Sequence, residues 1–280
     1  MREAEPIRSL QNPQVKAWSA LLTKKGRDAA DAFLVEGAHL VTEALRSGFA
    51  VDTVIYVPGT AAAEEAARLA GRDAGRWMPV SEQVMEKITE TRSPQGVAAV
   101  VRKRSAGLDE LLQHPPVGAL VAIDGIQDPG NLGTVIRSAD AAGAVGILLG
   151  AGTVDVYNPK TIRATMGSLF HLPIVPCDLA EALPRARALG VRVVATSLGA
   201  TRSCYEAPLG GSVCFLLGNE GAGVSPALEA LADESVIIPM RGKAESLNVA
   251  MAATVLLFEA LRQREYEASS GGTPTTCRRR

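Results

Sequence analysis

Residues 119–134, A-L-V-A-I-D-G-I-Q-D-P-G-N-L-G-T, join a short apolar run to a polar, glycine-rich turn, and this junction decides the fold class. The run Ala119–Ile123 suits a strand that is buried on both faces of a sheet. Similar runs predict further strands, and helical spacing predicts helices between them. The strands are expected at Gly146–Leu149, Val191–Ala195, Val213–Leu217 and Ser235–Pro239, and the helices at Thr134–Ala142, Leu179–Leu189 and Leu247–Arg264. Because strands alternate with helices, we predict an α/β domain built on a mostly parallel, helix-covered sheet.

The first hundred residues predict a second, smaller α/β domain. Short helices and strands are expected in alternation at 13–22, 33–36, 38–46, 51–57, 61–70, 81–89 and 97–101. The pair Pro115-Pro116 cannot continue a helix and marks a boundary. We therefore predict a first domain at 1–104, a linker at 105–117, a second domain at 118–266 and a disordered tail at 267–280.

The composition excludes several classes of protein. Of the 280 residues, 47% are hydrophobic and 21% are charged, so the chain can bury real cores. The formal net charge is -1, so nucleic-acid binding would depend on local basic clusters. The first residues contain no apolar signal segment and no run is long enough to span a bilayer, which predicts a cytoplasmic protein without a membrane partner. The cysteines and histidines are scattered without a C-x-x-C pair, so we expect neither a disulfide framework nor a metal site.

Glycine and hydrogen-bonding side chains follow three of the predicted strands, at 124–134, 218–225 and 239–248. In open α/β sheets ligands bind at the carboxyl ends of the strands, and glycines let the backbone approach a ligand closely. Each loop alone could be an ordinary turn, but three together predict one pocket. The dinucleotide-binding pattern G-x-G-x-x-G is absent, which disfavours a nucleotide-binding oxidoreductase, and the P-loop, G-x-S-x-G and H-E-x-x-H patterns are absent as well. The sequence pattern of these loops alone does not identify the ligand.

The three loops resemble the signature motifs of the SpoU, or TrmH, family of RNA 2′-O-ribose methyltransferases. Motif one is D-P-G-N-L-G-T-V-I-R-S-A-D-A-A-G-A at 128–144, and motif two is L-L-G-N-E-G-A-G-V-S at 216–225. Motif three is I-P-M-R-G-K-A-E-S-L-N-V-A-M-A-A-T-V at 238–255. The stretch F-L-V-E-G-A-H-L-V-T-E-A-L at 33–45 resembles the ribosomal-protein-like substrate-binding domain that precedes the catalytic domain in many members.

This resemblance implies a SPOUT fold in which the carboxyl-terminal segment of the parallel-sheet domain forms a deep trefoil knot. It also implies a homodimer with the active site near the interface. The implied cofactor is S-adenosylmethionine, held largely by main-chain groups, and no metal is needed. The implied cofactor-binding residues are Thr196, Ser197, Leu198, Gly218, Asn219, Gly221, Ile238, Met240, Ser246 and Leu247.

The resemblance assigns catalytic positions to Arg137, Asn131, Glu220, Ser246 and Asn248. Taken alone, Asn131 could cap a helix beginning at Leu132 or Gly133, Arg137 could lie on a solvated helix face, and Glu220 could accept backbone N–H groups of its own turn. Two roles are open for Arg137. The family assigns a base to this position, whereas a guanidinium that stays protonated suits a clamp on phosphate and on the developing alkoxide.

Basic residues outside the three motifs are candidates for RNA contact. They are Lys24, Lys25, Arg27 and Arg163, together with the junction triplet 102–104. A solvated surface is the alternative interpretation for each of them, and RNA binding through them would weaken with salt. The two-domain arrangement resembles members that modify ribosomal RNA, so we predict rRNA as the substrate. Transfer RNA and a catalytically silent RNA-binding protein of the same fold are the alternatives.

Overall fold

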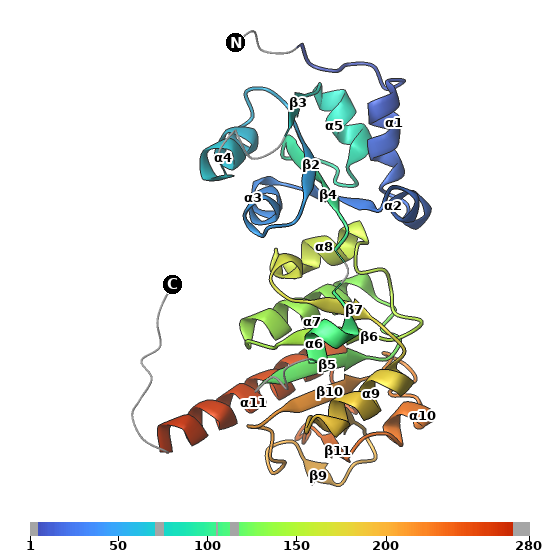
Figure 1. Cartoon of the computed structure of the whole chain (residues 1–280), viewed down its shortest axis with the longest axis vertical. Helices are drawn as coiled ribbons and strands as arrows, with labels where there is room; N and C mark the ends of the chain where they lie inside the picture. Colours follow the sequence, from blue (N-terminus) through green and yellow to red (C-terminus); the bar gives the residue numbers. More distant parts are fainter. Residues whose placement is uncertain (1–4, 71–75, 105, 113–117, 271–280) are drawn as a thin grey trace. The chain divides into compact units, whose positions relative to one another are not determined.

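The computed structural model describes residues 5–70, 76–104, 106–112 and 118–270. The chain divides into two compact units (Figure 1). Unit 1 comprises Met1–Arg104 together with Asp155–His171, and unit 2 comprises Ser105–Val154 together with Leu172–Arg280. None of the described helices is both long and apolar enough to cross a membrane.

Unit 1 is built on a four-stranded sheet of order β1-β4-β2-β3. The strands are β1 (Ala32–Glu36), β2 (Val51–Tyr56), β3 (Trp77–Pro79) and β4 (Val97–Arg102). The helices are α1 (Pro13–Ala20), α2 (Lys24–Ala30), α3 (Ala38–Arg46), α4 (Ala61–Ala70), α5 (Glu82–Ile88) and α8 (Pro159–Thr165). Helices α1 and α5 pack on one face of the sheet, where Trp18, Ile55 and Met85 belong to one buried cluster, and α3 pairs with α4 (Figure 1).

The segment Asp155–His171 groups with unit 1, although the sequence placed it inside the second domain. Its aromatic rings explain the grouping, because Tyr157 stacks on Phe33 of β1 with ring centroids 4.6 Å apart. The ring of Phe170 meets that of Phe49 edge-on at 5.1 Å. Unit 1 therefore has a core to which two separate stretches of the chain contribute.

Unit 2 is built on a seven-stranded sheet of order β7-β6-β5-β10-β8-β11-β9, in which all the strand pairs are parallel. The strands are β5 (Ala119–Ile123), β6 (Gly146–Leu149), β7 (Ile174–Pro176), β8 (Arg192–Thr196), β9 (Arg202–Ser203), β10 (Val213–Leu217) and β11 (Glu234–Ile237). The helices are α6 (Leu108–Leu112), α7 (Pro129–Ala141), α9 (Leu179–Ala188), α10 (Pro226–Glu229) and α11 (Val249–Ser270). The predicted α/β class with a parallel sheet is confirmed.

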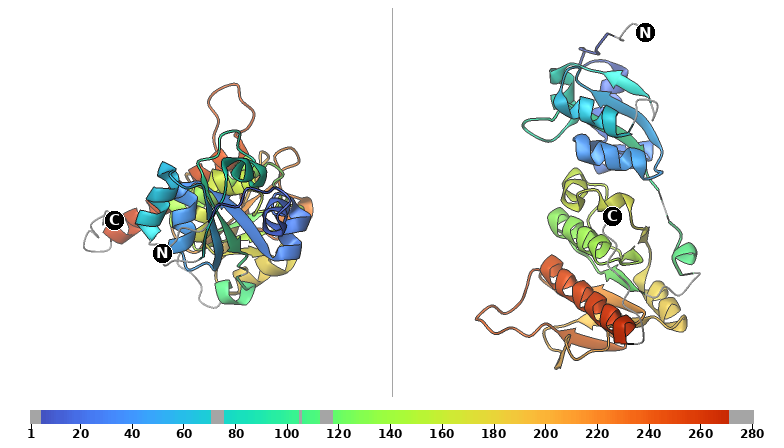
Figure 2. Two further views of the ribbon diagram at one scale, coloured as in Figure 1. Left: turned by 90° about the horizontal axis from the view of Figure 1, so that it is seen from above. Right: turned by 90° about the vertical axis from the view of Figure 1, so that its left-hand side faces the viewer.

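Helices cover both faces of this sheet. Figure 2 shows α7 and α11 on one face and α9 on the other. On the α9 face, Leu112 of α6 and Leu183 of α9 share a buried cluster with Leu120 and Leu216 of the sheet. Every residue of β5 and of β10 is buried, which explains why both strands are continuous apolar runs.

The strand order brings the three motifs together. Strand β10 lies between β5 and β8, although it follows β8 in the sequence, and β11 lies on the other side of β8. The last residues of β5 and β10, Ile123 and Leu217, pair directly, so the loops that follow them begin side by side. Because parallel strands end at the same edge, the loops after β5, β10, β8 and β11 meet there. The trefoil knot stays a prediction.

Several boundaries differ from the predicted ones. Helix α7 begins at Pro129 rather than at Thr134, because Asp128 caps it and proline is favoured in a first turn. Residues 108–112 of the predicted linker form α6, whereas the Pro115-Pro116 pair lies outside the described residues. Helix α11 continues to Ser270, so residues 267–270 of the predicted tail are helical. The rest of the predicted tail, 271–280, lies outside the described residues.

Candidate active site

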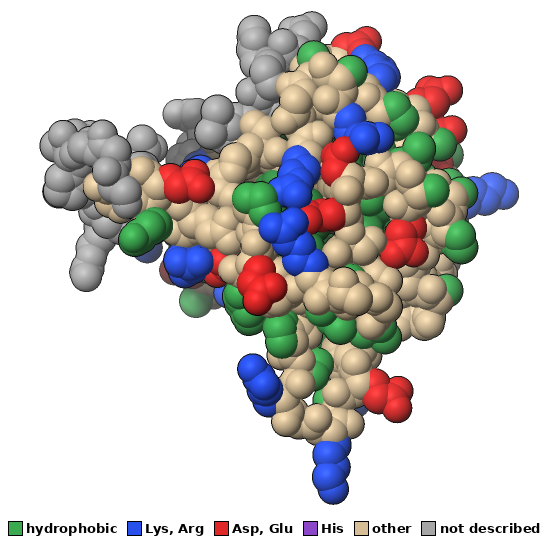
Figure 3. All heavy atoms as spheres, turned by 90° about the horizontal axis from the view of Figure 1, so that it is seen from below, with side chains coloured by type: hydrophobic (Ala, Val, Ile, Leu, Met, Phe, Trp, Pro, Cys, Tyr) green, Lys and Arg blue, Asp and Glu red, His purple; other side chains and the backbone are tan. Residues whose placement is uncertain are grey.

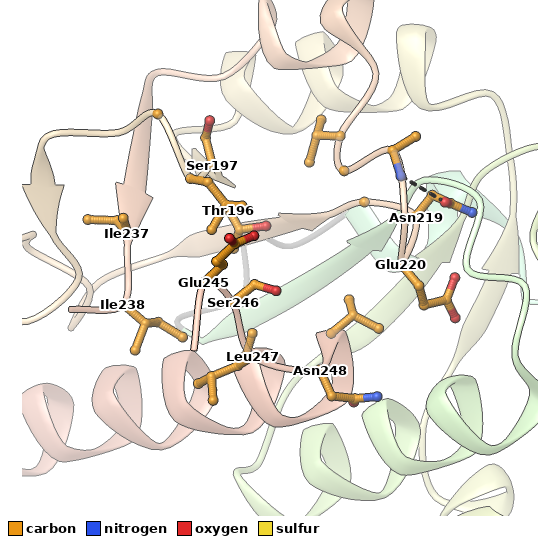
Figure 4. A pocket seen from close by; sticks show the side chains of 18 of the residues that line it. Thr196, Ser197, Asn219, Glu220, Ile237, Ile238, Glu245, Ser246, Leu247 and Asn248 are labelled. Carbon is orange, nitrogen blue, oxygen red and sulfur yellow. Dashed lines mark hydrogen bonds between the residues drawn. The ribbon is translucent and has the colours of Figure 1, made fainter. Parts of the chain in front are cut away.

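A cavity of about 720 Å³ lies in unit 2 at the carboxyl ends of β8, β10 and β11. Its volume falls within the range that is typical of small-molecule sites. Motif two, motif three and the end of β8 supply its lining. The predicted residues among the lining are Thr196, Ser197, Leu198, Gly218, Asn219, Glu220, Gly221, Ile238, Met240, Ser246, Leu247 and Asn248. The structure therefore brings together all of the predicted cofactor-binding residues, as Figure 4 shows for several of them.

Motif two forms a tight loop that its own polar groups hold. The backbone groups of Asn219 and Gly223 pair in both directions, with N···O distances of 2.9 Å. The side-chain oxygen of Asn219 accepts the N–H groups of Gly221 and Ala222 at 2.9 and 3.1 Å. A Cβ atom at Gly218 would lie 2.0 Å from the backbone of Gly223 and Val224. Only glycine fits at 218, because the returning loop occupies the space of a side chain.

Motif two is also tied to the loop after β5. The amide of Asn219 donates to the carbonyl of Gly125 at 2.9 Å. The backbone N–H of Ser225 donates to the carboxylate of Asp124 at 2.8 Å. These bonds join residues that are 94 and 101 positions apart in the sequence, and they follow from the direct pairing of β5 with β10.

A chain of polar side chains links the three motifs beside the cavity. The amide of Asn131 donates to the Glu220 carboxylate at 3.0 Å, and the amide of Asn248 donates to the Asn131 side-chain oxygen at 2.9 Å. Asn131 therefore bridges motif two and motif three, although it does not line the cavity itself. Asp128 rather than Asn131 caps α7, so the capping interpretation of Asn131 is wrong. Asn248 caps α11 by accepting the N–H of Ala250 at 2.9 Å.

Glu220 carries a negative charge that this network stabilises. Its carboxylate accepts the backbone N–H groups of Gln127 and Asp128, both at 3.1 Å, in addition to the Asn131 amide. Partial burial acts to raise the pKa of Glu220, but these hydrogen bonds outweigh it and lower the pKa from its ordinary value. The donors Gln127 and Asp128 belong to the loop after β5, so Glu220 braces a neighbouring loop in addition to its own turn.

The segment between β11 and α11 differs from this network. Figure 2 shows it projecting from the body of unit 2. Residues 241–248 are exposed, whereas Ile238 and Met240 are half-buried. Residues 239–247 make no hydrogen bond with any other residue that the structure describes. This side of the cavity is therefore open.

The charges around the cavity have one sign. Glu220, Glu229 and Glu245 line it, and its lining contains no lysine or arginine among the described residues. Glu229, where α10 ends, and Glu245, which directly precedes Ser246, were not among the predicted site residues. The charge of Glu245 inside the third glycine-bearing loop is the sequence signal that marks it. Carboxylates combined with the apolar side chains of Ile238, Leu247 and their neighbours suit a ligand that is partly apolar and positively charged.

Arg137 lies outside the cavity. It is exposed on α7, and its side chain makes no hydrogen bond or ion pair with any described residue. Its neighbour Ser138 contacts Thr254 of α11 through a 2.7 Å hydrogen bond between hydroxyl groups. The guanidinium therefore lies free on the helical face of unit 2 that α7 and α11 form.

The four predicted RNA-contacting residues have different surroundings in unit 1. The Arg27 side chain is only 3% exposed and donates to Asp155 at 2.6 Å and to the carbonyls of Leu21 and Leu22. The assignment of Arg27 to RNA is therefore wrong, because its guanidinium is engaged inside unit 1. Lys25 is exposed, Lys24 pairs with Asp28, and Arg163 lies 3.6 Å from Glu90.

Basic side chains of unit 2 are often paired as well. On the face seen in Figure 3, several lysine and arginine side chains lie beside acidic ones, and others project alone. Such pairing occurs at Glu234, which binds Arg192 and Arg202 with N···O distances of 2.8 Å. Among the described residues, no group of three or more His, Cys, Asp or Glu side chains is placed to hold a metal ion.

Two family models match the chain. The SpoU rRNA Methylase family matches residues 118–258, and the MRM3-like substrate binding domain matches residues 12–99. The first match spans the whole cavity, and the second lies within unit 1.

Named relatives and solved structures agree with these matches. The chain is 40% identical to the 23S rRNA (guanosine(2553)-2′-O)-methyltransferase RlmP of Bacillus subtilis, over 90% of this chain and 97% of the relative. It is 34% identical to the 23S rRNA (uridine(2479)-2′-O)-methyltransferase of Streptomyces viridochromogenes, over 95% and 94%. The crystal structure of the AdoMet-bound rRNA methyltransferase from Sinorhizobium meliloti superposes with a TM-score of 0.81 at 39% identity, over 92% of this chain and 97% of that one. The chain belongs to the SpoU rRNA methylase family.

Proposed function

We propose that this protein transfers a methyl group from S-adenosylmethionine to a ribose 2′-hydroxyl of ribosomal RNA. The observation that carries the proposal is the hydrogen-bonded chain Glu220–Asn131–Asn248, which joins all three motifs beside a cavity lined by carboxylates. The relatives named above act on 23S rRNA by their names.

The cavity suits S-adenosylmethionine. Its volume of about 720 Å³ accommodates a nucleoside with an amino-acid side arm, and its carboxylates complement a positive charge. Main-chain groups of Gly218, Ile238, Met240 and Leu247 would hold the adenosine, with Thr196, Ser197 and Leu198 beside them, and Asn219, Gly221 and Ser246 completing the set. When bound, this cofactor supplies a methyl group on a positively charged sulfur.

The protein's own residues position the ribose oxygen. In the reaction a new O–CH₃ bond forms, the S–CH₃ bond breaks with its electron pair left on sulfur, and the hydroxyl proton departs to a base or to water. Asn131 and Asn248 offer amide groups at the edge of the cavity, and Glu220 fixes the orientation of Asn131. Ser246 lines the cavity next to Asn248. Such alignment supplies several kcal/mol of rate enhancement.

We assign Arg137 to the RNA rather than to the cofactor. Its free, exposed guanidinium lies on α7, outside the cavity lining. A planar guanidinium binds phosphate oxygens through two parallel hydrogen bonds and stays protonated at neutral pH. Arg137 therefore acts as a clamp on the phosphate next to the target ribose and stabilises the negative charge that develops on the oxygen.

We also propose that the enzyme is a homodimer that pairs through α11. Met251 and Phe258 of α11 are 56% and 45% exposed, and their spacing of seven residues puts them on one side of this helix; Leu247, which is 38% exposed, lies just before the helix begins. A row of exposed apolar side chains is typical of a protein interface. Since Leu247 also lines the cavity, a second copy packed against this row would lie at the cavity's edge.

The RNA-binding surface is proposed to lie on unit 1, whose residues 12–99 match a substrate-binding domain. Lys24, Lys25 and Arg163 are the exposed or half-exposed cations that we assign to phosphate contact. Because ribosomal RNA is the proposed substrate, the cytoplasm is the proposed location. Salt should weaken RNA binding, since each phosphate contact releases counterions.

Mapping of 2′-O-methyl groups in total RNA tests this function. A strain without the gene should lose one methyl group in ribosomal RNA, and a plasmid copy of the wild type should restore it. A plasmid copy with Asn248→Ala should not restore it, although the protein accumulates. Loss of a methyl group from transfer RNA alone would replace the rRNA assignment, and an unchanged map would favour a catalytically silent RNA-binding protein.

A further inference from the structure

Three carboxylates line the cofactor cavity, and two of them are already engaged within the protein. Glu220 accepts three N–H donors from the loop after β5 and from α7. Glu229 accepts the hydroxyl of Ser235 at 3.1 Å. Glu245 makes no hydrogen bond or ion pair with any described residue. Of the three, Glu245 alone keeps its full hydrogen-bonding capacity for a ligand.

The position of Glu245 directs that charge to the cavity. In Figure 4, the side chains of Glu245 and Ser246 extend from the motif-three segment into the space that the labelled residues enclose. Arg241 and Lys243 precede it on the same segment, but neither lines the cavity. Its charge is thus not neutralised by a cation of the described lining.

We propose that Glu245 is a specificity-determining residue that distinguishes the methylated cofactor from the demethylated product by charge. This inference rests on the proposed function. S-adenosylmethionine carries a positive sulfur, and S-adenosylhomocysteine has the same adenosine and amino-acid groups around an uncharged sulfur. An unpaired carboxylate in the same cavity favours the first of the two.

The consequence is a directional exchange of cofactor. The reaction removes the positive charge from the sulfur, so the attraction to Glu245 ends at the moment of methyl transfer. The product then leaves more readily than the cofactor did, and fresh cofactor replaces it. Because Glu245 is exposed, solvent screens the interaction, and we expect a preference of about five- to tenfold in dissociation constant rather than a larger one.

Calorimetric titration of the purified, full-length protein tests the proposal without turnover. Glu245→Gln should weaken binding of S-adenosylmethionine about five- to tenfold and leave the affinity for S-adenosylhomocysteine within twofold of the wild type. Glu245→Asp, which keeps the charge, should keep most of the preference. Glu181→Gln removes an exposed carboxylate on α9 outside the cavity lining and should change neither affinity.

A salt series adds an independent measurement. The preference of the wild type for the charged cofactor should shrink as sodium chloride rises, and the ratio of the two dissociation constants should depend less on salt in Glu245→Gln, because two of the three cavity carboxylates remain there. Equal weakening of both ligands in Glu245→Gln would assign a structural role to this residue and overturn the proposal. The proposal would also be overturned if the ratio of the two dissociation constants in Glu245→Gln equalled that of the wild type. If the wild type binds neither ligand, the proposed function itself fails, and the two failures are thereby distinguished.

Discussion

The two sides of the cofactor cavity are built in opposite ways. The first side, which we call the bonded side, consists of the motif-two loop at 218–225, which lines the cavity, and the loop at 124–131 behind it, which does not. Asn219 and Ser225 donate hydrogen bonds to residues of 124–131, and the Glu220 carboxylate accepts backbone N–H groups from that loop, so the two loops are fastened to each other. The second side, the open side, comprises residues 238–247, of which 239–247 make no hydrogen bond with any described residue. Both sides contain residues of the signature motifs, and they differ in whether hydrogen bonds to the rest of the protein hold them.

The contrast suggests a division of labour. A side that is fixed before the ligand arrives holds reacting groups in place at no further entropic cost during the reaction. A side without internal bonds has low local stability and is drawn from the part of a structure that opens easily. We therefore assign orientation of the ribose to the bonded side, and entry and exit of the cofactor to the open side.

The largest effect is expected from a glycine-to-valine substitution, which should damage the bonded side and leave the open side unchanged. Gly218→Val places a side chain where the backbone of Gly223 and Val224 already lies 2.0 Å away, so the bonded side must be displaced. We expect loss of cofactor binding and a decrease in the free energy of unfolding on the order of 3 kcal/mol. Gly242→Val on the open side meets nothing within 4 Å and serves as the matched control. Calorimetry and urea unfolding measure both variants; equal losses in the two would contradict the distinction.

The next largest effect concerns a residue that belongs to neither side. Arg137→Ala should lower the turnover number about 100- to 1,000-fold, because a charge that stabilises the developing oxyanion is removed. Cofactor affinity should stay as in the wild type, since Arg137 does not line the cavity. The control is Arg185→Ala. Arg185 lies on α9 and pairs with Asp109, so this substitution removes the same charge elsewhere in unit 2 and should leave the turnover number unchanged. Turnover of Arg137→Ala near that of the wild type would exclude this residue from the mechanism.

A smaller effect tests the charge of Glu220 through pH. Because its pKa in the folded protein lies below the ordinary 4.5, the charged form contributes stability above pH 4.5, and this contribution disappears as the pH falls through the folded value. In Glu220→Gln, the NH₂ group of the new amide cannot accept a hydrogen bond, so one backbone N–H loses its acceptor. This variant should therefore be less stable than the wild type at pH 7, by less than about 1 kcal/mol. The difference, measured by urea unfolding, should shrink as the pH falls below 4.5 and through the lower pKa of the folded protein. A difference that grows as the pH falls would contradict the assigned direction.

The smallest expected effect sharpens the description of the open side. Arg241 and Lys243 are exposed trypsin sites within it. Limited trypsin digestion should cut there first, and saturating S-adenosylmethionine should slow this cut several-fold by ordering the segment. Mass spectrometry identifies the cut. Protection of sites in unit 1 to the same degree would indicate a general stabilisation rather than closure of the open side.

Sequence patterns predicted the sheet well because its strands are buried on both faces. The runs Ala119–Ile123, Gly146–Leu149 and Val213–Leu217 are strands with the predicted boundaries. The order of the strands was not predictable from periodicity, because the insertion of β10 between β5 and β8 depends on contacts between distant segments. Short elements such as β3 and β7 were missed, since three residues carry no measurable period.

The residues of the site were predicted, but the hydrogen bonds between them were not. The loops can be recognised in the sequence by glycine and amide residues that follow apolar runs. The family resemblance adds residue roles that the spacing of these residues does not supply. The bridging of Glu220 and Asn248 by Asn131 requires three chain segments to meet and so could not be read from any one of them. Arg27 was misassigned because a basic cluster in sequence does not reveal that one member has a buried carboxylate partner, Asp155, more than a hundred residues away.

Methyl transfer from labelled S-adenosylmethionine to ribosomal RNA of a strain that lacks the gene tests the central claim most directly. After alkaline hydrolysis, a ribose 2′-O-methyl group protects the adjoining phosphodiester bond and leaves the label in a dinucleotide. We predict that the wild type places the label in such dinucleotides and that Asn248→Ala places none. Label recovered in mononucleotides would mean methylation of a base and would contradict the claim, as would an absence of label from a wild-type protein that binds the cofactor.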